Sequence, residues 1–261
     1  MGPFSILLVV QLAICSYVVS RTQGHTGVTG ERVLDEVTNA VGPNRQTRVS
    51  LKADQDDNLK VYLEVLQNGV RIEGPKVQRR LGPRIFRSGE LDLEAILPKG
   101  QVPSIAHRST IGGESRLHAV VSWGFNQDRL GGLSYSIYVI HEDLRTGGTA
   151  ITYRGREINA ELKTFLILDA DSDGHLTMID AGRSGKSGDM HVHAIGPRGE
   201  VKLLQALEGF SFSLIDGFDS SKLTVVIEDE EVHCDKCPEN WRCYTTRILR
   251  WSKEKKRLVE K

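Results

Sequence analysis

The chain has 261 residues, with 34 basic and 34 acidic side chains, so its formal net charge at pH 7 is zero. A balanced charge supplies no excess of basic surface for nucleic acid, and we expect no nucleic-acid partner. A chain of this length can bury a substantial core, and the part after residue 20 lies in the upper size range of one β domain.

The amino terminus carries an uncharged apolar run at residues 6–14, followed by small or medium residues at 18–20. A signal peptidase reads residues of this size, so we predict a signal peptide at residues 1–20 and a secreted, extracellular protein. A membrane anchor is disfavoured, because a span needs about 20 predominantly apolar residues and this run is shorter and broken by Gln11. We therefore expect no membrane partner.

Four places along the chain share one pattern: an apolar run, a short acidic or glycine-rich turn, a leucine, and a second run rich in β-branched residues. The four leucines are Leu59, Leu117, Leu176 and Leu223. Apolar alternation bounded by turn residues is the signal of a β-hairpin, and recurrence at a near-fixed step indicates either a duplicated unit or coincidence among ordinary hairpins. We therefore predict a mainly β protein, with repeated β-hairpins in a propeller-like or sandwich domain.

A stretch bounded by proline and glycine, at residues 98–103, suits a linker or a long loop. The predicted organisation is an N-terminal β region at 21–97, this candidate linker, and a β-rich domain at 104–261. The last of these contains the most informative motif of the chain, at residues 169–180.

Segment 169–180 sets side-chain oxygens at every second residue and places Gly174 where a cation-wrapping loop must turn. Calcium takes six to eight oxygen ligands, and the pattern matches positions 1, 3, 5, 6 and 12 of the EF-hand loop. We therefore predict a Ca²⁺ site of weak affinity, because the closing acid is an aspartate and not the longer glutamate. The predicted ligands are Asp169, Asp171, Asp173, His175 through its carbonyl, Thr177, and Asp180 as the closing residue. The alternative is a solvated β-turn, since turns also prefer aspartate and glycine.

The residues before this loop, Glu161 to Leu168, resemble the entering helix of an EF-hand. The residues after it, at 181–188, contain three glycines and make a poor second helix. The loop also resembles the calcium loops of extracellular β-propeller repeats, in which the same aspartate pattern joins two strands. The hairpin pattern favours this second resemblance and predicts strands at 165–168 and 175–179.

With secretion, the loop resembles those of secreted calcium-binding proteins of extracellular matrices, including the EF-hand-bearing proteins of mineralised shells. This resemblance implies a structural or mineral-associated protein, with calcium and matrix proteins or glycans as partners and with no catalytic residues.

Two alternative functions stay open. One is a secreted propeller or sandwich module that binds protein or glycan, with calcium purely structural. The other is a secreted hydrolase, which needs convergent polar groups, such as two acids and a histidine, in one deep cleft.

Two further features concern metal and redox chemistry. His191 and His193 place two imidazoles on one face of a strand, which can bind a metal, but the sequence shows no third ligand nearby, and such a pair is usually a solvated strand face. Loss of Cys15 with the signal peptide leaves an odd set of cysteines, Cys234, Cys237 and Cys243. We predict one intrachain disulfide and a remaining thiol that links two copies into a dimer. A zinc site that combines these cysteines with a histidine is disfavoured, because exported thiols oxidise.

Overall fold

A computed structural model describes residues 30–260, except 112, 127–131, 156–160, 172, 185–186, 216–222 and 232–242. The predicted signal peptide lies outside these residues. Within the described part of the chain, no helix is long and apolar enough to cross a membrane.

The described strands form four four-stranded antiparallel sheets, in each of which consecutive strands are hydrogen-bonded neighbours. The first sheet contains β1 (Arg32–Gly42), β2 (Arg45–Ala53), β3 (Asn58–Gln67) and β4 (Val70–Pro83). The second contains β7 (Val102–Ile111), β8 (Ser115–Asn126), β9 (Gly132–Asp143) and β10 (Thr149–Arg154). The third contains β11 (Glu161–Leu168), β12 (Leu176–Ser184), β13 (Ser187–Ile195) and β14 (Val201–Gly209). The fourth contains β15 (Ser211–Ile215), β16 (Thr224–Glu231), β17 (Cys243–Ser252) and β18 (Arg257–Glu260).

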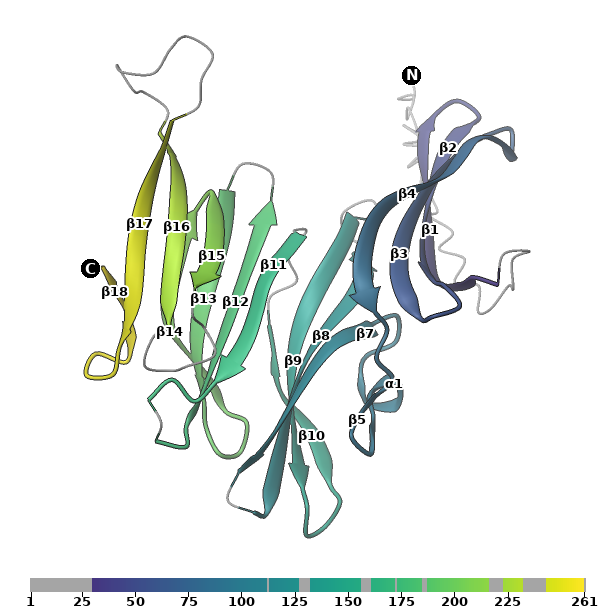
Figure 1. The fold of residues 1–261 in the computed structure, drawn as a ribbon. Helices are drawn as coiled ribbons and strands as arrows, with labels where there is room; N and C mark the ends of the chain where they lie inside the picture. The colour runs from purple at the N-terminus through teal and green to yellow at the C-terminus, as the bar shows by residue number, and fades with distance from the viewer. Residues whose placement is uncertain are drawn as a thin grey trace, which may run out of the picture.

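The four sheets stand side by side in chain order (Figure 1). The alternation of side chains along the strands explains this stacking, because successive residues point to opposite faces of a sheet. In β12, Met178 belongs to a core cluster shared with the first and second sheets, and its neighbour Ile179 belongs to a cluster shared with the fourth. The third sheet is therefore buried on both faces.

The prediction of a mainly β protein with repeated β-hairpins in a propeller-like or sandwich domain is confirmed. A four-stranded antiparallel meander is also the unit from which propeller blades are built. Each of the four leucine-marked hairpins falls in a different sheet, at β2–β3, β7–β8, β11–β12 and β15–β16. Three of the four leucines are buried, and Leu176 packs against the largest core cluster.

The resemblance of residues 161–168 to a helix is wrong, because these residues form β11. The strand β11 pairs with β12, and Leu168 lies opposite Thr177 across the loop. The interpretation that strands flank the loop is therefore confirmed. Residues 161–168 form a strand because β12 is paired with β13 along one edge only. If these residues formed a helix, the backbone N–H and C=O groups along the other edge of β12 would be unpaired.

A small unit joins the first two sheets. It consists of β5 (Arg87–Ser88), β6 (Leu91–Asp92) and α1 (Leu93–Ile96), which is capped by the Asp92 carboxylate. Leu93 and Leu97 pack against Val120 and Tyr138 of the second sheet. Core packing thus crosses the candidate linker at 98–103, whose last residues already belong to β7.

Candidate metal centre

Asp180, His191 and His193 share one face of the third sheet. Asp180 of β12 lies directly opposite His191 of β13 in the antiparallel register, and Met178 lies opposite His193. Residues two apart on a strand point to the same face, so His193 is the diagonal neighbour of Asp180. The pairing of two strands therefore supplies the third ligand that the local sequence around the histidines lacks.

The three side chains meet at hydrogen-bond distance. The Asp180 Oδ2 atom lies 3.3 Å from His191 Nδ1, and Asp180 Oδ1 lies 3.2 Å from His193 Nε2. One ligand atom from each residue lies within 4.8 Å of the other two. Among the described residues, this is the one group of three or more such side chains that is close enough to hold a metal ion.

Burial and hydrogen bonding act on Asp180 in opposite directions. Burial opposes its ionisation, but the hydrogen bonds and charges of His191 and His193 prevail and hold the pKa of the carboxyl below its usual value. An ionised carboxylate only accepts hydrogen bonds, so the two facing ring nitrogens carry protons in this arrangement. The other ring nitrogen of His193, Nδ1, is buried and has no hydrogen-bond partner among the described residues.

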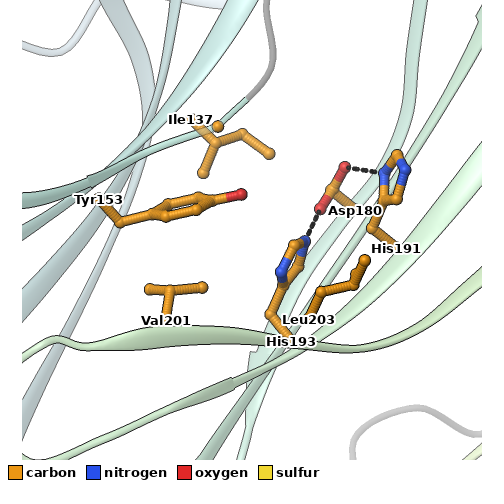
Figure 2. A pocket seen from close by; sticks show the side chains of 8 residues that line it. Ile137, Tyr153, Asp180, His191, His193, Val201 and Leu203 are labelled. Atoms are coloured by element: carbon orange, nitrogen blue, oxygen red, sulfur yellow. Dashed lines mark hydrogen bonds and ion pairs between the residues drawn. The ribbon is translucent and has the colours of Figure 1, made fainter.

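A cavity of about 360 Å³ opens in front of the three side chains, between the second and third sheets. Figure 2 shows Tyr153 of β10 on the opposite wall, with its hydroxyl directed toward Asp180. The ring of Tyr153 also lies near that of His193, with 5.7 Å between the ring centroids. The residues that line the cavity are Ile137, Tyr153, Gly155, Asp180, His191, His193, Val201 and Leu203.

The glycine at position 182 makes room for a second buried phenol beside this face. A Cβ atom added to Gly182 would lie 2.5 Å from the hydroxyl oxygen of Tyr135, which is buried and has no hydrogen-bond partner among the described residues. Burial, followed by the charges of Asp180 and Asp189, raises the pKa of Tyr135. This phenol therefore stays protonated beside the Asp180 carboxylate.

The donor set fits a divalent transition metal ion. Zinc binds imidazole nitrogen and carboxylate oxygen at about 2.0–2.2 Å in tetrahedral geometry, which sets neighbouring ligand atoms about 3.3 Å apart. The observed separations of 3.2 and 3.3 Å join the two histidine nitrogens to different oxygens of Asp180, and one ligand atom from each residue lies within 4.8 Å of the other two. Two histidines and one carboxylate leave a coordination position open, as in sites where zinc also binds water or a substrate.

The predicted calcium loop has a different set of contacts. The Asp169 carboxylate accepts hydrogen bonds from the backbone N–H groups of Asp173 and Gly174, at 3.1 and 2.9 Å. The Asp171 carboxylate accepts one from the Trp251 indole at 2.7 Å, and the Lys256 ammonium lies 3.4 Å from Asp173. Gly174 has a φ of 82°, as a tight loop requires.

Two of the predicted calcium ligands lie on β12, beyond the loop. Thr177 is buried in the strand, and Asp180 lies three residues further on. An extended strand advances about 3.3 Å per residue, so it carries Asp180 away from the loop and toward the histidines. The structure therefore brings Asp180 together with His191 and His193 and not with the loop carboxylates. Calcium binding by the loop stays a prediction.

A second polar cluster, which sequence reasoning missed, joins β5 to the second sheet. His118 is fully buried, and its Nδ1 atom lies 2.9 Å from Ser88 Oγ and its Nε2 atom 2.8 Å from Glu142 Oε2. Arg116 lies 3.4 Å from the same carboxylate oxygen. The order serine, histidine, carboxylate is that of a hydrolase triad, but full burial of the imidazole favours a structural role that fixes the β5–β6 unit.

Comparisons with known proteins give no family. No protein-family model matches the chain, and no curated protein matches it in sequence. Among solved structures, the chain is similar to the glycoside hydrolase family 32 β-fructofuranosidase of Bombyx mori, with a TM-score of 0.41 and 9% identity over 87% of this chain and 48% of that one. It is also similar to a thermostable family-43 glycoside hydrolase, with a TM-score of 0.39 and 13% identity over 88% of this chain and 74% of that one. Both scores are too low to establish a shared activity.

The predicted disulfide involves residues at or beyond the described limits. Cys234 and Cys237 lie outside the described residues, and Cys243 begins β17. If residues 1–20 are removed as predicted, we expect a non-reducing gel of the protein to show a covalent dimer that collapses to a monomer on reduction, because three cysteines cannot all pair within one chain. Replacement of Cys243 by serine should change the dimer fraction, whereas a wild-type band that is monomeric without reductant would contradict the prediction.

Proposed function

We propose that this protein is an extracellular β-sheet binding module that holds a divalent transition metal ion through Asp180, His191 and His193. Zinc is the ion that we propose. The observation that supports it most is the convergence of three ligating side chains on one wall of the cavity. The open coordination position of the ion would face the cavity, where a ligand can reach it. Secretion follows from the predicted signal peptide, and partners among matrix proteins or glycans follow from the resemblance of the loop.

The electrostatics of the centre favour a cation. Asp180 is only 4% exposed, and an isolated charge is costly to bury unless it is paired. The imidazoles of His191 and His193 donate hydrogen bonds to the carboxylate, and a bound metal ion would place a full opposite charge beside it. A divalent ion supplies that charge and uses the lone pairs of the same two nitrogens once their protons leave.

The chemistry of the ligands separates this centre from the calcium loop. Calcium is a hard cation that takes six to eight oxygen ligands, whereas the centre offers two nitrogens and one carboxylate. We therefore assign zinc to the centre and keep calcium for the loop residues Asp169, Asp171 and Asp173. The two ions would occupy independent sites: zinc would lie against one face of the third sheet, and calcium would lie in the loop between β11 and β12.

A binding role is favoured over glycoside hydrolysis at this cavity. Most glycosidases use two carboxyl groups on either side of the scissile bond. The described residues that line the cavity include one carboxylate, Asp180, and both of its oxygens face histidines. This composition does not supply the two acids and one histidine that would indicate a secreted hydrolase.

Zinc titration of the secreted chain tests the proposal. We expect one zinc ion per chain, and we expect His193→Ala to weaken binding by more than the roughly 10–100-fold that loss of an outer-shell partner costs. The matched control is His175→Ala, because His175 is an exposed histidine of the loop. Unchanged zinc affinity in a folded His193→Ala protein would overturn the assignment.

A further inference from the structure

The wall of the cavity opposite the metal ligands carries one polar group. Tyr153 comes from β10 of the second sheet, whereas Asp180, His191 and His193 come from the third. Its hydroxyl is directed across the cavity toward Asp180 (Figure 2). A donor placed in this way is available to a molecule that enters between the sheets.

The space between the two polar walls is apolar. Ile137 of β9 and the residues Val201 and Leu203 of β14 line it. No arginine or lysine is among the described lining residues. A doubly charged phosphate ester would need several charge-assisted donors, which the described lining residues do not offer. A singly charged group with an aliphatic body matches the walls better.

We propose that the cavity binds a small aliphatic carboxylate, with one oxygen at the open position of the metal ion and with the Tyr153 hydroxyl donating a hydrogen bond to the other. This inference rests on the proposed metal centre and adds the chemical class of its ligand. The aliphatic body would lie against Val201 and Leu203. A cavity of about 360 Å³ lies at the small end of ligand sites, so the acid has only a few carbons.

The state of the phenol agrees with its role as a donor. The ordinary pKa of a phenol is about 10. The hydroxyl therefore keeps its proton at neutral pH and can donate it to a carboxylate oxygen. An aliphatic ammonium ion has no lone pair for the metal ion and is repelled by its charge, so it should not bind.

Calorimetric titration of the zinc-loaded chain with butyrate is the test, with butylammonium as the charge-reversed control. We expect butyrate to bind and butylammonium not to bind. Tyr153→Phe keeps the ring and removes the hydroxyl, so it should weaken butyrate binding by roughly 13–160-fold, as loss of one hydrogen bond to a charged group does. Zinc affinity should stay unchanged. The matched control is Tyr244→Phe, because Tyr244 is an exposed tyrosine of β17.

A second variant tests the cavity itself. Val201→Phe should fill the space, abolish butyrate binding and preserve zinc binding. If the wild type binds zinc but not butyrate, or if Tyr153→Phe binds butyrate as tightly as the wild type, the ligand inference is wrong and the metal centre stands. If the wild type binds no zinc, both are wrong. Cobalt-loaded protein whose visible spectrum changes on addition of butyrate would support direct coordination.

Discussion

Zinc at about 100 times its dissociation constant is expected to stabilise the folded chain by about 2.7 kcal/mol, because an ion that binds only the folded state shifts the unfolding equilibrium by mass action. For a domain of this size, that corresponds to a rise in melting temperature of roughly 5–11 °C. The unfolded chain does not hold Asp180, His191 and His193 together, so the binding free energy appears as folding stability. Differential scanning calorimetry with and without zinc measures the effect.

Calcium should act through different residues in the same assay. If the loop binds calcium with a dissociation constant in the extracellular range of about 10⁻⁴ to 10⁻³ M, calcium at about 1 mM stabilises the chain by about 0.4–1.4 kcal/mol. We expect His193→Ala to remove the zinc shift and keep the calcium shift. The double variant Asp169→Ala, Asp173→Ala should do the reverse. Loss of both shifts in either variant would contradict two independent sites, and a zinc shift that survives in folded His193→Ala would contradict the metal centre.

The hairpins were predictable because their determinants are local. Apolar alternation and the turn residues before Leu59, Leu117, Leu176 and Leu223 lie within a few residues of each other, and each marks a real hairpin. The order of the sheets in space depends on residues that are distant in the sequence, because it depends on which face of each sheet is apolar. The strand β12 contributes side chains to two core clusters, one on each face of its sheet.

The sequence does not predict the cluster of Asp180, His191 and His193, because Asp180 also fits a pattern that lies nearer in the sequence. His191 and His193 were recognised as two imidazoles on one strand face. Asp180 was assigned to the loop, since it falls at the twelfth position of a familiar spacing. The register of the hairpin places Asp180 beside the two histidines: Ser184 lies opposite Ser187, and this pairing sets Asp180 opposite His191. A hairpin interpretation of the glycine-rich stretch at 182–188 would have predicted this contact.

The cluster of Ser88, His118 and Glu142 could not be found in this way. His118 is 30 residues from Ser88 and 24 residues from Glu142. Ser88 also belongs to a separate two-stranded unit, whose docking on the second sheet depends on apolar packing by Leu93 and Leu97. Such a contact depends on the tertiary structure, and the spacing of residues in the sequence does not predict it.

Replacement of His118 by leucine is expected to lower the free energy of unfolding by about 2–4 kcal/mol at neutral pH, because it leaves the buried Ser88 hydroxyl and the Glu142 carboxylate without this partner. Burial lowers the pKa of His118 below its usual value of 6.5, against the opposing effect of Glu142 and together with the charges of Arg116 and Arg108. Between the folded and unfolded pKa values, the unfolded state binds more protons, so stability rises with pH in that window. The neutral His118 imidazole contributes fully to the free energy of unfolding above about pH 6.5. This contribution is lost as the pH falls through the lowered pKa of His118 in the folded state.

The pH dependence of urea unfolding distinguishes this effect from simple loss of packing. We expect the wild type to lose stability as the pH falls from about 7 to 5, and we expect His118→Leu to show a shallower slope over the same range. Some slope should remain, because burial also lowers the pKa of His107. Replacement of the exposed His175 by leucine is the control and should leave the slope unchanged. If His118→Leu is destabilised but keeps the full wild-type slope, the imidazole is not the group whose protonation destabilises the fold, and the buried cluster acts through packing alone.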